Sequence, residues 1–390
     1  MKRLRPIVEQ DPSRFEYCRA LTIQVFNFHI STQKIKAENY ALANDLLSRL
    51  KHVRCVKVEG YRALEVTGVY QWPMVSILRQ NMPEVEHVII EEPRTDLQDI
   101  IDCLDFPFLK TLSLGDIEKS PVSMGGGIVL DQEQARAGSF TSLTLGKYSA
   151  SASTLRQLLE WPKVLSHFSM PLIYSKDYIG PFAIRSMLLI HKHTLGSLTI
   201  GVGKTTIADR YINVSDFSKL EVLGFPRNRH HPDLEFMSDI ADRILAPNIK
   251  VLRWDFKGWN GRIERWRDFR RREVKWLMML AREAHARKST LRRIEIIFDP
   301  EPAESQLTDG YPWDLMDAVG EKIRKYGIEL GYKTPPITKD RWVSLVVSKY
   351  RETTPYGLTL DREGKIVLRG KGTKGSGPLN QYWPKIGEKL

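Results

Sequence analysis

Apolar residues recur along most of the chain in a short phrase, apolar-x-x-apolar-x-apolar. Its clearest copy is Leu109-Lys110-Thr111-Leu112-Ser113-Leu114. Copies, spaced 24 to 42 residues apart, begin at Cys18, Val53, Val85, Leu109, Phe140, Leu165, Leu195, Leu220, Ile249 and Leu291. The second half of each phrase alternates apolar and polar residues, which is typical of a half-buried β-strand. Short units that recur in this way predict a repeat architecture.

Amphipathic helices are predicted between the strand phrases, where apolar residues recur at helical spacing. The candidate helices are 38–50, 96–105, 154–161, 179–193, 234–245 and 261–288. Parallel strands need such a crossover, so the alternation of strand and helix predicts a parallel sheet. We therefore predict an α/β protein, an irregular solenoid with a parallel sheet on one face and helices on the other.

The repeat stops after the Leu291 phrase, and the chain is predicted to have four parts. These are an N-terminal extension, the solenoid with a closing helix over 314–326, a C-terminal cap and a flexible basic tail, at 1–17, 18–333, 334–369 and 370–390. The cap is predicted as a strand over 341–348 and a hairpin over 358–368. Atypical ends are expected because a stack of repeats must cover its terminal core faces.

The net charge of +12 is concentrated in two segments. Residues 257–293 hold 13 Lys and Arg against 4 acids, and residues 362–389 hold 7 against 2. An Arg-rich helix over 261–288 together with a basic tail is one basis for an alternative function, nucleic-acid binding. The helix's aromatic residues, Trp266, Phe269 and Trp276, fall on its apolar stripe. We expect them in the core, which favours a solvated basic face over a nucleic-acid surface.

Composition limits the cellular setting. No apolar run approaches the roughly 20 residues that a transmembrane helix needs. The cysteines, Cys18, Cys55 and Cys103, match neither a disulfide framework nor the paired spacing of a zinc site. We therefore expect an intracellular protein, cytoplasmic or nuclear, without membrane contact.

The segment Gly201-Val202-Gly203-Lys204-Thr205-Thr206 resembles the end of a phosphate-binding loop. That motif requires a glycine five residues before the Gly-Lys pair, and Leu198 stands there instead. Leu198 is also a core position of the Leu195 strand phrase. A nucleotide-binding enzyme that uses Gly203-Lys204-Thr205 is the second alternative function.

Histidines occur in two groups, His191-Lys192-His193 and His230-His231, with no Cys or carboxylate at ligand spacing. We predict that they are solvated residues of a helix end and a loop. No nucleophile elbow or dinucleotide fingerprint is present. We therefore expect a non-enzymatic protein without catalytic residues, metal or cofactor.

The strand phrase resembles the leucine-rich repeat L-x-x-L-x-L, for example in Leu109 to Leu114 and in Leu195 to Ile200. The long units, the phrase from Pro247 to Trp254 and the Pro-rich turns resemble the irregular leucine-rich arrays of fungal F-box proteins. The resemblance covers about residues 15–300 and rests on the pattern of the repeats. It implies a protein-binding solenoid that recognises substrates for a ubiquitin ligase.

The sequence departs from that family in two ways. The asparagine expected three residues beyond the last position of the strand phrase is replaced in nearly every copy, by Ile117, Tyr148, Ile173, Gly203 and Lys257, and only Asn228 matches. We therefore expect no asparagine ladder. The helical F-box that precedes the repeats in that family has no counterpart in residues 1–17. We do not expect this chain to bind a ligase adaptor through such a module.

The predicted binding surface is the side of the strands that faces away from the core. Side chains alternate along a strand, so the third and fifth positions of each phrase should face outward. The residues assigned to this surface are Thr111, Ser113, Ser142, Thr144, His167, Ser169, Ser197, Thr199, Arg253 and Arg293. Its centre is small and hydroxyl-bearing and its far rim is charged. We expect it to bind a protein partner, which the sequence does not name.

Overall fold

The computed structural model describes a large part of the chain in defined ranges. These are residues 14–24, 41–59, 73–91, 101, 104, 106–117, 130, 133–173, 179–201, 211–227, 236, 238–256, 269–300, 311, 313–333, 337–353, 357–360 and 366–369. The chain divides into two compact units, Met1–Glu221 and Val222–Leu390. The boundary between them falls inside the solenoid predicted over 18–333.

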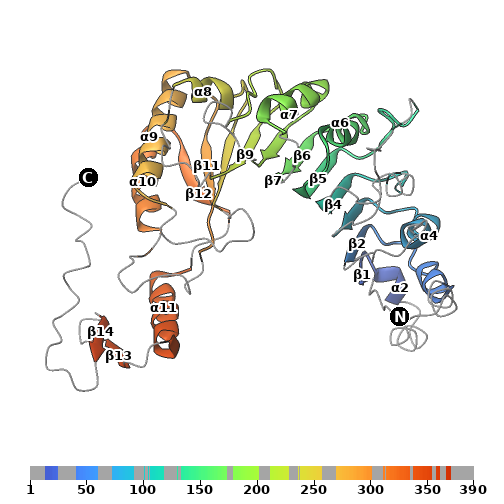
Figure 1. Ribbon diagram of the computed structural model, residues 1–390, viewed down its shortest axis with the longest axis horizontal. Helices are drawn as coiled ribbons and strands as arrows, with labels where there is room; N and C mark the ends of the chain where they lie inside the picture. The colour runs from blue at the N-terminus through green and yellow to red at the C-terminus, as the bar shows by residue number, and fades with distance from the viewer. Residues whose placement is uncertain are drawn as a thin grey trace. The chain divides into compact units, whose positions relative to one another are not determined.

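The first unit contains a parallel sheet whose strands pair in chain order (Figure 1). Its strands are β1 (Ala20–Gln24), β2 (Cys55–Glu59), β3 (His87–Ile90), β4 (Thr111–Ile117), β5 (Ser142–Tyr148), β6 (His167–Met170) and β8 (Ser197–Ile200). The short strand β7 (Leu172–Ile173) continues beside the end of β5. Each of the phrases from Cys18 to Leu195 therefore supplies a strand, as predicted.

The second unit repeats this arrangement with four parallel strands among its described residues. They are β9 (Val222–Pro226), β10 (Val251–Asp255), β11 (Arg293–Ile297) and β12 (Glu329–Tyr332), again in chain order. The sequence pattern did not indicate β12. The predicted hairpin is present, with β13 (Gly357–Leu360) antiparallel to β14 (Ile366–Arg369). The α/β class and the parallel sheet are confirmed.

Among the described residues, helices lie between several of the strands, and most of them lie along one side of the sheet in their unit (Figure 1). The first unit has α2 (Arg14–Tyr17), a helical segment at 41–47, α4 (Pro73–Asn81), α6 (Ala152–Glu160) and α7 (Pro181–Leu188), which continues into a 3-10 turn, η1 (Leu189–His191). The second has α8 (Ser238–Ile244), α9 (Arg271–Ala286), α10 (Asp314–Arg324) and α11 (Lys339–Thr353). No described helix has the length and apolar character that crossing a bilayer requires.

Local sequence explains where several helices begin. The Ser151 hydroxyl accepts a hydrogen bond of 3.1 Å from the Thr154 N–H and so caps α6. Pro181 stands at the first position of α7, where its missing N–H leaves no bond unmade. At the start of α9 the Glu273 carboxylate accepts from the Arg270 N–H at 2.8 Å.

The core lies between the sheet and the helices and is filled by the fourth and sixth positions of the strand phrases. In β4 these are Leu112 and Leu114, both fully buried, whereas Thr111 and Ser113 between them are partly exposed. In β9 the register places Leu223 inside and Val222 on the outer side. The second unit adds an aromatic cluster in which Trp254 packs on Trp276 with ring centroids 4.7 Å apart. The buried face is continuous along each sheet, because neighbouring strands are aligned residue by residue.

Successive repeats, each consisting of one strand phrase and the segment that follows it, are joined by one recurring backbone pattern. The N–H groups of the second and third residues of a phrase both donate to the carbonyl of the second residue of the preceding phrase. For example, Lys110 and Thr111 donate to Glu86 at 2.7 and 3.0 Å. The same pair of bonds recurs from the Val53 phrase to the Leu195 phrase, and again between Leu291 and Ile249 phrases. This repetition fixes the register of each repeat on its neighbour.

In three of the repeats a hydroxyl group adds a second bond at the same edge of the sheet. Ser139, Thr194 and Thr290 each stand immediately before a phrase. Their hydroxyls donate to the carbonyls of the first residue of the preceding phrase, at Leu109 (3.2 Å), Leu165 (2.9 Å) and Ile249 (2.7 Å). These side-chain to backbone hydrogen bonds connect neighbouring repeats. Sequence reasoning missed them, although a Ser or Thr directly before the phrase is a readable signal.

Replacing Thr194 with valine should lower the free energy of unfolding by about 0.5–1.5 kcal/mol, because the Leu165 carbonyl loses a partner while the side-chain volume is kept. Urea denaturation measures the change. Thr199→Val is the matched control, since the Thr199 hydroxyl makes no such bond in the described structure. The inter-unit role of Thr194 is contradicted if both variants shift the midpoint equally.

The strand predicted over 341–348 is wrong, because these residues lie within helix α11. The run Trp342 to Val347 is short, apolar and rich in β-branched residues, so its pattern fits either element. Trp342 and Val346 are both buried and lie four residues apart, on one helical face. The ring of Trp342 packs edge-on against Trp313, with centroids 5.6 Å apart. Packing on α10 decides the conformation.

Other predicted elements are confirmed in part. The closing helix over 314–326 is α10. The helix predicted over 154–161 overlaps α6, which begins two residues earlier, and 179–193 and 234–245 contain α7 and α8. Helix α9 occupies the second half of the helix predicted over 261–288, and residues 261–268 lie outside the described residues. So do most of 96–105 and the whole tail at 370–390.

Candidate functional site

Eight of the ten predicted surface residues lie together on the outer side of the first unit's sheet. They come in pairs from the neighbouring strands β4, β5, β6 and β8, and form two aligned rows. One row is Thr111, Ser142, His167 and Ser197, and the other is Ser113, Thr144, Ser169 and Thr199. We call these eight residues the hydroxyl panel.

The hydroxyl panel rests on a rigid floor. Behind it, Leu112, Leu143 and Leu198 are fully buried, and Phe168 is 2% exposed. Neighbouring strands are about 4.8 Å apart and alternate residues about 7 Å apart. The panel therefore spans roughly 14 by 7 Å between the outermost Cα positions. Its side chains are held at fixed spacings because backbone bonds fix all four strands.

The panel's seven hydroxyl groups make no hydrogen bond in the part of the chain that the structure describes. Ser139, Thr194 and Thr290, at the sheet edge, are by contrast all bonded to backbone carbonyls. A hydroxyl can donate one hydrogen bond and accept two. The panel thus presents polar groups of both kinds to whatever contacts it.

His167 is the most exposed residue of the panel and its only ring. Its Nδ1 lies 2.8 Å from the Ser166 Oγ, which is also 3.0 Å from the Thr141 carbonyl oxygen. This contact holds the imidazole in place. The ring therefore gives the panel one aromatic side chain among small ones.

Charges beside the panel are neutralised locally. On β2 the Lys57 ammonium contacts Glu59 at 2.5 Å and Glu91 at 2.8 Å. Hydrogen bonds to these two carboxylates, that to Glu59 foremost, raise the pKa of Lys57 to about 12. Just before β4, Lys110 contacts Glu86 at 2.7 Å, and this bond lowers the pKa of the Glu86 carboxyl. The panel is therefore a surface of low net charge.

The remaining two predicted residues, Arg253 and Arg293, lie on the sheet of the second unit. Arg253 Nε is 2.6 Å from the Glu295 carboxylate, and Arg293 Nη2 is 3.6 Å from it. The two guanidinium groups therefore flank one shared acid. They differ from the hydroxyl panel because their charges already have a partner within the protein.

The other sequence candidates fall into two groups. Gly203-Lys204-Thr205 and His230-His231 lie outside the described residues. Just before the former, Gly201 continues past β8, and a Cβ there would stand 2.1 Å from the Pro171 carbonyl oxygen. Glycine is needed at this position because the backbone packs closely on the preceding repeat of the same sheet. Among the described residues no cluster of His, Cys, Asp and Glu is suited to a metal ion.

The prediction that His191 is solvated is wrong. Its side chain is 1% exposed, and Nε2 lies 2.8 Å from the Leu159 carbonyl oxygen. Burial lowers the pKa of His191, and the nearby Arg136 guanidinium acts in the same direction. His191 is the last residue of η1. The polar residues Lys192 and His193 that follow it led the sequence pattern to indicate an exposed segment.

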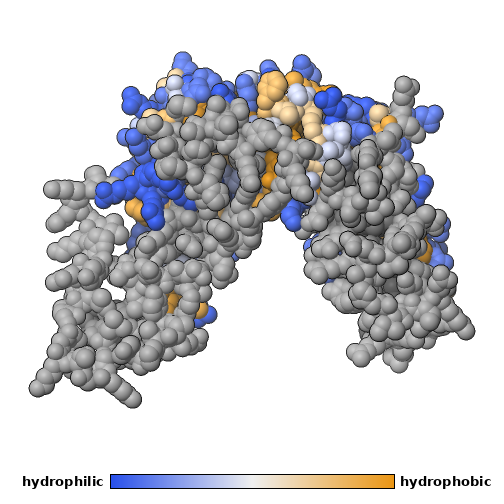
Figure 2. Space-filling view, in the orientation of Figure 1, coloured by the Kyte–Doolittle hydropathy of each residue, from blue (hydrophilic) through white to orange (hydrophobic). Residues whose placement is uncertain are grey.

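A separate exposed surface lies over α7. Figure 2 shows hydrophobic colouring gathered there, where Phe182 is 76% exposed and Ile190 is 47% exposed. These side chains lie on the helical side of the first unit, whereas the hydroxyl panel lies on its open side. The first unit therefore offers two chemically different surfaces.

Comparison with known proteins assigns no family to this fold. No protein-family model matches the chain, and no curated protein matches its sequence.

Proposed function

We propose that this protein is a non-enzymatic scaffold for protein–protein interaction, and that its partner binds to the hydroxyl panel. The observation that carries the proposal is the alignment of eight small or polar side chains on a partly exposed sheet face, whose seven hydroxyls make no hydrogen bond among the described residues. A surface that is rigid before binding loses little conformational entropy when a partner docks. This favours the panel as a recognition surface.

The finer architecture that we propose is an irregular leucine-rich-repeat-like solenoid. The recurring backbone bonds between successive phrases support it, because each unit then packs mainly on its neighbours. The resemblance to fungal F-box proteins extends the proposal to substrate recognition for a ubiquitin ligase. On that view the panel would select the protein to be modified.

The chemistry of the panel indicates the kind of contact. Hydroxyl groups on short side chains let a partner's backbone approach the sheet closely, and they pair with either amide donors or carbonyl acceptors. The low net charge around the panel means that long-range attraction contributes little to its association rate. We therefore expect binding that depends on shape and hydrogen bonds more than on salt.

Replacing Thr111, Thr144 and Thr199 together with lysine should abolish or weaken partner binding by at least about tenfold, because three long charged side chains would cover the centre of the surface. The partner is first captured with the tagged full chain and then purified. Its affinity for the wild-type protein and the variant is measured by isothermal titration calorimetry.

The matched control places the same three charges on the helical side, as Gln80→Lys, Ser186→Lys and Ser215→Lys at exposed positions. Circular dichroism confirms that both variants are folded. Unchanged affinity of the panel variant, with the control behaving as wild type, would show that the partner binds elsewhere.

A further inference from the structure

Helices α9 and α10 of the second unit pack against each other and are unevenly charged. Every acidic residue on them is engaged. Glu273 pairs with Arg227, Glu283 with Arg287, Asp314 with Lys339 and Glu321 with Arg324, while Asp317 accepts from the Tyr332 hydroxyl. Each of these carboxylates therefore already has a partner within the protein.

Several cations on the same two helices have no such partner. Arg271, Lys275 and Arg282 on α9 and Lys322 on α10 are exposed, and none contacts an acid in the described structure. Arg271, Lys275 and Arg282 are spaced by four and seven residues, so they lie along one face of α9. That face is the one turned toward α10, since Arg271 and Lys275 line a cavity together with residues of α10.

This first cavity has a volume of about 170 Å³ and lies between the two helices. Its apolar lining is Val274, Leu315, Ala318 and Val319, and its polar lining is Arg271, Lys275 and Lys322. An apolar cavity of about 150 Å³ can hold a molecule of the size of benzene. The first cavity can therefore take one aliphatic side chain. The charged residues that line it are all basic.

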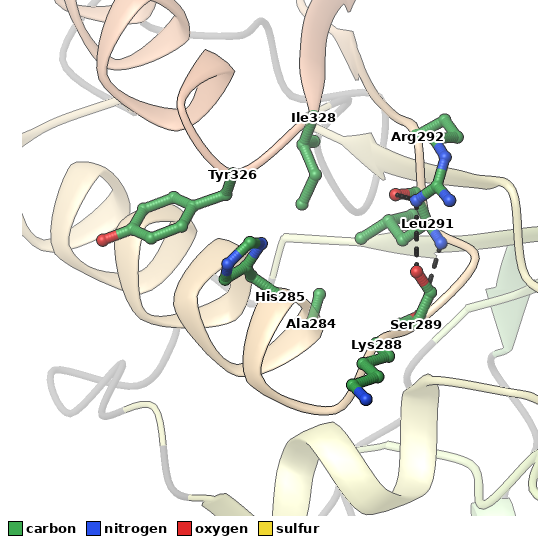
Figure 3. Close-up of a pocket in the computed structure, with 8 residues that line it drawn as sticks. All are labelled: Ala284, His285, Lys288, Ser289, Leu291, Arg292, Tyr326 and Ile328. Carbon is green, nitrogen blue, oxygen red and sulfur yellow. Dashed lines mark hydrogen bonds between the residues drawn. The ribbon is translucent and has the colours of Figure 1, made fainter.

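A second cavity of about 230 Å³ lies where α9 and α10 end (Figure 3). Ala284, Leu291 and Ile328 form its buried apolar floor. The rings of His285 and Tyr326 lie side by side, with centroids 5.6 Å apart. The charged residues that line it, Lys288 and Arg292, are again basic.

The two cavities lie along the same pair of helices. Residues 271, 275, 278, 282 and 285 follow one another at spacings of three and four along α9, so they share a face. The α9 residues that line the first cavity and those that line the second are about 11 residues apart, which corresponds to roughly 17 Å at 1.5 Å per residue. We call the surface that holds both cavities the α9–α10 groove, and it is long enough for about three turns of a bound helix.

We propose that this α9–α10 groove binds an acidic amphipathic helix of another protein. Two apolar side chains of that helix enter the two cavities, and its carboxylates contact Arg271, Lys275, Arg282 and Lys322. Docking of an amphipathic helix into an apolar groove is a general mode of peptide recognition. The one-signed rim selects acidic partners and rejects basic ones, because like charges brought together cost free energy.

The apolar cavities distinguish this partner from a nucleic acid. A phosphate backbone would use the cations but would leave both cavities unfilled, and its affinity would fall steeply with salt. Among the described residues, Trp254 and Trp276 are buried, so they offer no surface on which bases stack. The geometry favours a peptide that combines carboxylates with apolar anchors.

The test uses the full-length protein and fluorescein-labelled helical peptides of about 18 residues, or roughly 27 Å. The main probe carries leucines at three- and four-residue spacing on one face and glutamates on the flanks. A second probe replaces the leucines with serine, and a third replaces the glutamates with lysine. Fluorescence anisotropy should show binding of the main probe and at least about tenfold weaker binding of the other two.

Two variants locate the site. Lys275→Glu with Lys322→Glu should weaken binding of the main probe by about tenfold through charge. Ala318→Leu, which fills the first cavity without changing charge, should weaken it as well. The control, Lys163→Glu with Lys192→Glu, makes the same change of charge at exposed positions of the first unit and should bind as wild type.

The proposal is overturned if the main probe does not bind, or if the Lys275/Lys322 variant binds it as tightly as the control does. It is also overturned if a labelled single-stranded oligonucleotide binds instead, with a steep salt dependence that the same variant abolishes. Thermal unfolding of each variant verifies that the helices are intact, and the two independent variants keep the test valid if one fails to fold.

Discussion

Replacing Glu273 with alanine is expected to lower the free energy of unfolding of the second unit by about 3–5 kcal/mol. The Glu273 side chain is fully buried, and the Arg227 side chain beside it is 2% exposed. One carboxylate oxygen accepts from Arg227 Nε and Nη2 at 3.0 and 2.9 Å and from Arg272 Nε at 2.7 Å. The other accepts from the Arg270 N–H at the start of α9.

The cost arises because the variant removes the buried carboxylate that accepts two hydrogen bonds from the Arg227 guanidinium. Arg227 follows β9 and is fixed by its backbone N–H, which donates to the Asp255 carbonyl at 2.6 Å. Its guanidinium also lies over the Phe256 ring, 5.5 Å from the centroid. The group therefore cannot turn to solvent without disturbing the strand. Removing one partner of a buried ion pair costs much more than the pair itself contributes.

Urea unfolding followed by tryptophan fluorescence measures this change, since several tryptophans of the second unit are buried near α9. Glu283→Ala, which removes a partly exposed partner of Arg287, is the control and should cost about 1 kcal/mol or less. The double variant Arg227→Met with Glu273→Met should recover most of the loss, because it removes both charges. A loss below about 1 kcal/mol for Glu273→Ala would contradict the role assigned to this ion pair.

The strands could be predicted because their side chains face two different environments. In β4 and β5 the alternation of Leu with Ser or Thr reports directly which side is buried. Parallel order followed from the helices between the strands. The hydroxyl panel was predictable for the same reason, since a correct register brings the same phrase positions side by side.

The charged and titratable core residues could not be predicted in this way. Glu273 lies among arginines and lysines of an amphipathic helix, and its partner Arg227 is 46 residues away in the sequence. Periodicity assigns such residues to solvent, because it carries no information on contacts between distant segments. His191 is a second example, buried against Leu159 through a bond that depends on how η1 meets α6.

The α9–α10 groove was inaccessible to sequence reasoning for a related reason. The basic character of α9 is visible in the composition, but the sequence does not show which acids are consumed by other contacts. Only the structure shows that Glu283 pairs with Arg287, while Lys275 and Arg282 contact no acid among the described residues. Charge pairing in three dimensions separates a solvated basic face from a candidate recognition surface.

Replacing Leu112 with alanine should lower the free energy of unfolding of the first unit by about 2–5 kcal/mol. Leu112 is fully buried at the centre of the sheet, between Val88 on β3 and Leu143 on β5, which are buried in the same register. Strands β3 and β5 hold β4 on both sides, so the cavity left by the shorter side chain cannot close without moving the strand backbone. The expected cost therefore combines lost hydrophobic transfer energy with a residual cavity.

The adjacent residue supplies the control for this prediction. Thr111→Ala removes a partly exposed side chain from the opposite side of the same strand and should change the free energy by about 0.5 kcal/mol or less. Urea unfolding followed by circular dichroism gives both values. Because the two residues share one backbone segment, a large difference between them measures the difference between the two faces of β4. Equal shifts would mean that Leu112 is not a core residue and that the alternation of the phrase does not separate core from surface.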